Sequence, residues 1–190
     1  TSGCQSIHDK KEVTVEILHT NDMHSHFAGS KNGSACITEN DCEGGYGRVA
    51  EYVKEVKERN PNAIFLDAGD QFQGSLLYVN YHSPLVGKIT DKMRYDFATF
   101  GNHEFDYRSQ GLANMLRAAK SSGETLPEIV VCNVDWDAME KDGLKDGQKQ
   151  IKEAFEAYGV KDYVVVQKGD TRIAVVGLSL IHISEPTRLR

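Results

Sequence analysis

Three apolar segments of the sequence each run into a short loop that carries carboxylate, amide or imidazole side chains. Residues 13–18 alternate apolar and polar positions as a half-buried strand does, and residues 63–66 and 97–100 are short apolar runs. The side chains that follow these segments are those of Asp22, His24, Asp70, Asn102, His103 and Asp106. In α/β proteins, loops beyond the carboxyl ends of strands turn side chains over the sheet, and oxygen and imidazole ligands suit divalent ions. The repeated pattern therefore predicts a metal site built from three loops.

Each of these residues also has a purely structural alternative. Asp22 and Asp70 could form turns, and Asn102 could adopt the left-handed conformation of a turn residue. His103 could be a buried structural histidine, and Asp106 could cap the helix that follows it. Because all of them occur at successive strand ends, the ligand interpretation is favoured.

The loops carry the strongest sequence signature of the chain. Residues 18–27 (LHTNDMHSHF), 67–75 (DAGDQFQGS) and 101–106 (GNHEFD) resemble the calcineurin-like metallophosphoesterases, and more closely the 5′-nucleotidase family. The resemblance implies an α/β fold, a two-sheet sandwich flanked by helices. It covers residues 13–178, which would be the N-terminal part of a catalytic domain. Residues 1–12 are expected to form a tether, and residues 179–190 match nothing in the family and are interpreted as a non-native tail.

The resemblance also implies a centre of two divalent ions such as zinc, manganese or cobalt. By this correspondence Asp22 and His24 bind the first ion, Asp70 bridges both, and Asn102 binds the second. A bridging ligand needs two oxygens, which a carboxylate has. His103 would stabilise the transition state or protonate the leaving oxygen, and Asp106 would orient it.

The activity implied by the family is metal-dependent hydrolysis of phosphate esters, with 5′-nucleotides giving nucleosides and phosphate. The alternatives are UDP-sugars, dinucleotides or cyclic nucleotides as substrates, or a non-catalytic fragment. The family's later imidazole ligands have no counterpart in the sequence, so we expect the 190-residue chain to be inactive by itself. A nucleotide is the expected partner, and no protein partner is inferred.

Composition excludes some function classes. The 190 residues suffice for one domain with a core, and 39% hydrophobic with 26% charged residues is ordinary for a globular chain. A net charge of −6 leaves no basic surface for nucleic acid. No apolar run is long enough to cross a membrane.

The four cysteines indicate the compartment. Cys36 and Cys42 lie in a polar loop and could be free thiols, but a disulfide is favoured, and the resemblance to ecto-5′-nucleotidases points the same way. Cys132 is expected to be a buried core thiol. Cys4 resembles the lipidated residue of a bacterial lipoprotein, with a disordered thiol as the alternative. These features favour an extracytoplasmic protein, anchored by lipid if Cys4 is modified.

The remaining elements follow from periodicity. Helices are expected at 47–59, 83–93 and 109–121, a strand at 129–132, and a hairpin at 163–168 and 172–176. The first helix should bury Val49, Tyr52, Val53 and Val56. Residues 31–45 should be irregular, and 136–159 a loop with a surface helix.

Overall fold

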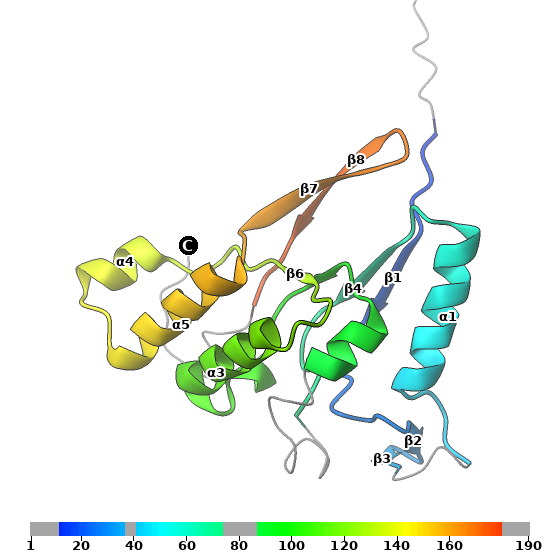
Figure 1. Cartoon of the computed structure of the whole chain (residues 1–190), viewed down its shortest axis with the longest axis horizontal. Coiled ribbons are helices and arrows are strands. Elements are labelled where there is room, and N and C mark those ends of the chain that lie inside the picture. The colour runs from blue at the N-terminus through cyan, green and yellow to red at the C-terminus, as the bar shows by residue number, and fades with distance from the viewer. Residues whose placement is uncertain (1–11, 37–40, 74–86, 180–190) are drawn as a thin grey trace, which may run out of the picture.

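Four parallel strands form the central sheet of the computed structural model, which describes residues 12–36, 41–73 and 87–179 (Figure 1). The strand order is β1-β4-β5-β6. The strands are β1 (Ile17–Thr20), β4 (Ile64–Asp67), β5 (Phe97–Ala98) and β6 (Glu128–Ile129). Because neighbouring strands are parallel, their carboxyl ends lie along one edge of the sheet, where the three predicted loops begin.

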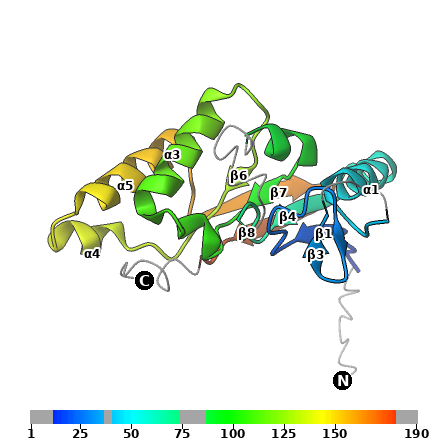
Figure 2. The ribbon, with the colours of Figure 1, turned by 90° about the horizontal axis from the view of Figure 1, so that it is seen from below.

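Helices cover one face of this sheet. They are α1 (Tyr46–Arg59), a helical segment at 87–93, α3 (Arg108–Ser121), α4 (Trp136–Lys141) and α5 (Asp146–Tyr158). Helices α3 and α5 lie side by side (Figure 2) and share a core that includes Leu112, Leu116, Ile151 and Phe155. The expectation of a surface helix within 136–159 was therefore incomplete, because α5 buries an apolar stripe against α3.

The opposite face of the sheet packs against the hairpin of β7 (Tyr163–Lys168) and β8 (Thr171–Val176), at the predicted position. Val164 joins a cluster with Ile64, Phe97 and Val130 of the central sheet. The outward side of the hairpin is apolar and exposed at Tyr163 (61%). An α/β fold with a parallel sheet flanked by helices is thus confirmed, and the hairpin supplies a second, smaller sheet.

Several expected boundaries were wrong for identifiable reasons. Strand β1 begins at Ile17 rather than at residue 13, because its partner β4 begins at Ile64, which pairs with Ile17. Tyr52 does not join the buried face of α1 and is 55% exposed. Strand β6 ends at Ile129, and Cys132 lies beyond it and is only half-buried.

The segment expected to be irregular contains a small hairpin of β2 (Ser30–Lys31) and β3 (Ser34–Ala35). The disulfide Cys36–Cys42 closes the loop that follows, which confirms that pairing. Most of the expected tether (residues 1–11, including Cys4) and of the expected tail (residues 180–190) lies outside the described residues. So do residues 83–86 at the start of the expected helix. Among the described helices, none combines the length and apolarity needed to cross a bilayer.

Candidate metal centre

Backbone hydrogen bonds tie the first two metal-candidate loops together at the carboxyl edge of the sheet. The N–H of Asp22 donates to the carbonyl of Gly69 at 3.0 Å, and the N–H of His24 donates to that of Asp70 at 3.0 Å. The third loop approaches so closely that a Cβ on Gly69 would lie 2.1 Å from the nitrogen of Gly101. Only glycine fits at such a contact, so these two glycines allow the loops to converge.

The converging loops adopt an uncommon backbone conformation. Asp22 (φ 51°), His24 (φ 44°) and Asp70 (φ 54°) all have positive φ, although none is glycine. Left-handed residues with side chains cost free energy and persist where surrounding contacts fix them, often at functional sites. The sequence predicted which residues lie here, and the structure adds that three of them are held in strained conformations.

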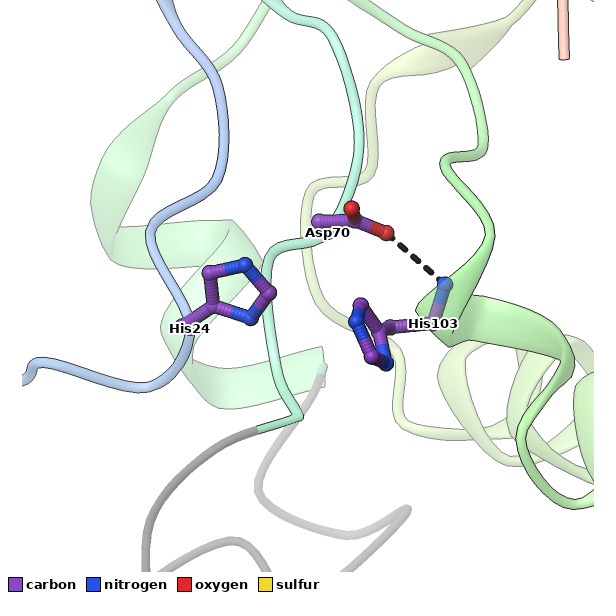
Figure 3. A group of neighbouring side chains, drawn as sticks. All are labelled: His24, Asp70 and His103. Carbon is purple, nitrogen blue, oxygen red and sulfur yellow. Dashed lines mark hydrogen bonds between the residues drawn. The ribbon is translucent and has the colours of Figure 1, made fainter. Parts of the chain in front are cut away.

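Three of the predicted side chains come together in a compact group (Figure 3). Ligand atoms of His24, Asp70 and His103 all lie within 4.8 Å of one another. The two imidazole rings meet edge to face with centroids 5.1 Å apart. The N–H of His103 donates to Asp70 Oδ1 at 2.8 Å, which fixes the carboxylate between the two loops.

The hydrogen bonds of the two histidines leave the same nitrogen available in each. Nδ1 of His24 lies 2.9 Å from the carbonyl of Gln73, and Nδ1 of His103 lies 2.9 Å from Asp106 Oδ2. In His24, donation from Nδ1 places the lone pair on Nε2, the usual arrangement for a metal-binding histidine, whereas in His103 it leaves Nε2 free to carry or release a proton. The imidazole of His24 and the carboxylate of Asp70 are donors that suit zinc, manganese or cobalt, so this group fits a divalent ion with His103 beside it.

The other two predicted ligands lie beside this group. Asp22 is exposed; its Oδ1 is 3.8 Å from His24 Nε2, and its Oδ2 accepts from the side chain of Asn21. Asn102 precedes the short 3₁₀ helix η1 (His103–Phe105), and its carbonyl accepts from the N–H of Phe105. Their ligand roles remain predictions.

His103 and Asp106 form the predicted pair. The hydrogen bond that His103 donates to the Asp106 carboxylate raises the pKa of His103 above its usual value, with burial acting against it. The alternative role for Asp106, capping the next helix, does not apply, because the N-cap of α3 is Tyr107 and no side-chain cap bond forms there. Asp106 is therefore directed at the imidazole.

Glu104 links the second and third loops through backbone hydrogen bonds. Its carboxylate accepts backbone hydrogen bonds from Asp70 at 2.9 Å, Gln71 at 3.0 Å and Gly101 at 2.8 Å. Burial raises the pKa of Glu104, while these three N–H donors lower it. It thus joins the second loop to the third.

Sequence reasoning missed a buried carboxyl next to the site. Asp67, the last residue of β4, is 6% exposed and accepts a hydrogen bond from the hydroxyl of Thr20 at 2.9 Å. Burial raises its pKa to about 8, against opposing hydrogen bonds from Thr20 and from the N–H of Gly69. Its sequence signal was weak, since an acid at the end of an apolar strand is indistinguishable from a loop residue.

Comparison with known proteins places this arrangement in a family. The family model for calcineurin-like phosphoesterases matches residues 15–169. An apyrase of Tabanus yao is 32% identical over 95% of this chain and 30% of its own length. The human 5′-nucleotidase is 40% identical over 56% of this chain and 19% of its own.

Among solved structures, the 5′-nucleotidase precursor of Thermus thermophilus superimposes with a TM-score of 0.65 and 29% identity. The match covers 87% of this chain and 28% of that one. The chain therefore spans less than a third of each of these relatives. From the matched residues and the converging loops, the chain belongs to the calcineurin-like phosphoesterase family, alongside its 5′-nucleotidase and apyrase members.

Proposed function

We propose that this chain forms the metal-binding, N-terminal part of an enzyme that hydrolyses 5′-nucleotides to nucleosides and phosphate. The observation that carries the proposal is the group of His24, Asp70 and His103, whose ligand atoms lie within 4.8 Å of one another. The relatives named 5′-nucleotidase supply the substrate class, since phosphoesterase membership alone leaves the ester unspecified.

The residues would divide the work in the following way. His24 and Asp70 would hold divalent ions, with Asp70 as the ligand shared by two of them and with Asp22 and Asn102 as further ligands. Two divalent ions, when bound, stabilise both the attacking and the leaving oxygen of a phosphoryl transfer. His103 faces the same space, and its Nε2 can donate a proton to the leaving oxygen.

The protonation of His103 is set by its partner. Asp106 accepts a hydrogen bond from Nδ1–H of the imidazole, fixes the ring and raises its pKa, which favours the protonated form. A proton donor of raised pKa suits a leaving alkoxide, which must be protonated as the bond to phosphorus breaks. The same geometry would serve if His103 instead stabilised charge on the phosphoryl group.

Substrate choice is tested by phosphate release from AMP, with a UDP-sugar, a dinucleotide and a cyclic nucleotide as competitors. The assay uses the protein extended to the length of its relatives, with manganese, zinc or cobalt added. We expect AMP to be hydrolysed fastest and Asp70→Ala to abolish turnover. Faster hydrolysis of another substrate would replace the nucleotide assignment, and unchanged turnover of Asp70→Ala would remove the proposed centre.

The 190-residue chain should differ from the extended protein. Asp22, His24, Asp70 and Asn102 are fewer ligands than two ions require, so we expect a loosely held ion and no measurable AMP hydrolysis. Metal-dependent phosphate release from this chain, lost in Asp70→Ala, would contradict that expectation.

The proposal includes an extracytoplasmic location. The disulfide Cys36–Cys42 would persist in an oxidising compartment, which favours the cell exterior. A lipid anchor at Cys4 is part of the proposal, and mass spectrometry of the mature N-terminus in a bacterial host would test it.

A further inference from the structure

A buried carboxyl that takes no part in the proposed chemistry lies at the junction of the first two metal loops. Asp67 ends β4 and pairs in register with Thr20, which ends β1. Thr20 is followed closely by Asp22 and His24, and Asp67 is followed by Gly69 and Asp70. The two residues therefore occupy the last paired position before the strands give way to the metal loops.

Hydrogen bonds through this pair reach both loops and the core. The Thr20 hydroxyl donates to Asp67 Oδ1 at 2.9 Å, and the same hydroxyl lies 2.7 Å from the hydroxyl of Tyr95. The N–H of Gly69, next to Asp70, also donates to the Asp67 carboxyl. Tyr95 is 5% exposed and stacks on Phe65 with ring centroids 4.3 Å apart, which gives the network a rigid end.

The packing beneath the start of the second metal loop is incomplete. A cavity of about 50 Å³ lies there, lined by the polar residues Asp67, Gln71 and Glu104 and by the apolar residues Phe100, Met115 and Leu116. A loop over a cavity lacks contacts that would oppose an inward shift, so its position depends on hydrogen bonds from fixed groups. Glu104 supplies some of these bonds to the backbone of Asp70, and Asp67 supplies others to Gly69 and Thr20.

We infer that Asp67 is a positioning residue of the metal centre, which sets the spacing between the His24 loop and the Asp70 loop through Thr20 and Gly69. The inference rests on the proposed metal centre. This positioning role requires a side chain that hydrogen-bonds to both Thr20 and Gly69, and it does not require that the side chain be charged. Asparagine meets this requirement, because its oxygen can accept from Gly69 while its amide donates to Thr20.

The test is the dissociation constant for Mn²⁺ alone, measured by calorimetric titration of the 190-residue chain, with thermal melting in parallel. Loss of a group that supports metal ligands lowers affinity about 10-fold to 100-fold, and we expect that loss in Asp67→Ala. Asp67→Asn should stay within about threefold of wild type, because its hydrogen bonds are retained. Thr20→Val keeps the side-chain volume, removes the hydroxyl and should weaken binding in the same direction as Asp67→Ala.

Met115→Ala is the matched control for a merely structural effect. It removes packing from the far wall of the same cavity and should lower the melting temperature without changing Mn²⁺ affinity. Equal affinity in wild type, Asp67→Ala and Thr20→Val would overturn the inference, and so would an equal loss of affinity in Met115→Ala. A wild-type chain that binds no Mn²⁺ would overturn the proposed function itself. Failure of the proposed function can therefore be told apart from failure of the inference about Asp67.

Discussion

The carboxyl edge of the central sheet carries the three metal loops and is called here the metal-loop edge. Its backbone conformation and that of the hairpin of β7 and β8 are fixed by different kinds of interaction. The hairpin pairs residues in simple register from Tyr163↔Val176 to Lys168↔Thr171, and its inner side chains pack on the sheet. The metal-loop edge instead contains left-handed Asp22, His24 and Asp70. Local preferences account for the hairpin, whereas the loops hold their conformations only through contacts with one another.

The largest effect that would test this contrast comes from adding one methyl group in each region. Gly69→Ala places a Cβ at φ 98° and 2.1 Å from a backbone nitrogen, so we expect a loss of more than about 2 kcal/mol of unfolding free energy. Gly169→Ala in the hairpin turn, at φ 58° with its nearest neighbour 3.5 Å away, should cost about 1 kcal/mol. Urea unfolding measures both variants. Equal losses would mean that the loop edge is no more constrained than the turn.

The same contrast explains what the sequence could predict. Alternation and the Gly169-Asp170 turn were enough to place β7 at its observed bounds, and helical periodicity placed α1 within one residue of its observed start. At the metal edge the ligand types were predictable from their spacing. The left-handed conformations were not, because the bonds that fix them join residues far apart, such as Asp22 to Gly69.

The burial of polar side chains could not be predicted from the sequence either. Asp67 and Glu104 are held by partners from different loops, and only the folded arrangement shows that each is enclosed. Partial errors in the elements have the same origin: Tyr52 fits the apolar pattern of α1, but no neighbouring element covers it. Periodicity identifies a face and cannot identify what packs against it.

A smaller loss of unfolding free energy is expected on removing the disulfide that follows the first metal loop. The disulfide Cys36–Cys42 closes a short loop beside the bridge of Ser30 with Glu43, whereas the hairpin needs no such link. Replacing both cysteines by serine should cost about 2 kcal/mol, because a short closed loop removes modest entropy from the unfolded chain.

Urea unfolding with and without reductant would measure this cost. Cys132→Ser serves as a control, since Cys132 is a free thiol and its replacement should leave the sensitivity to reductant intact. Two alkylatable thiols at positions 36 and 42 in the non-reduced protein would contradict the pairing.

The smallest expected change concerns the protonation of His103. Asp106 raises the imidazole pKa, so Asp106→Asn should lower it toward its ordinary value while metal content stays the same. A raised folded-state pKa stabilises the fold below the unfolded pKa, and that contribution is lost as pH rises through the folded value. The variant should therefore lose more stability at pH 5 than at pH 9.

Titration of the His103 ring proton by NMR in the metal-free chain gives this pKa directly. His26 provides an internal reference, because its Nδ1 lies near the carbonyls of Met23 and His24 and not near Asp106. An unchanged pKa of His103 in Asp106→Asn would show that the pair has no electrostatic consequence.

The most direct test of the metal centre is Mn²⁺ binding to the wild-type chain and to Asp70→Ala, followed by calorimetric titration. Asp70 supplies the carboxylate of the group that it forms with His24 and His103, so we expect the variant to lose at least about tenfold in affinity. Asp91→Ala removes another buried carboxylate, one that accepts a hydrogen bond from Thr125 away from the site, and should bind Mn²⁺ as wild type does. Equal affinity in wild type and Asp70→Ala would contradict the assignment of this edge as a metal centre.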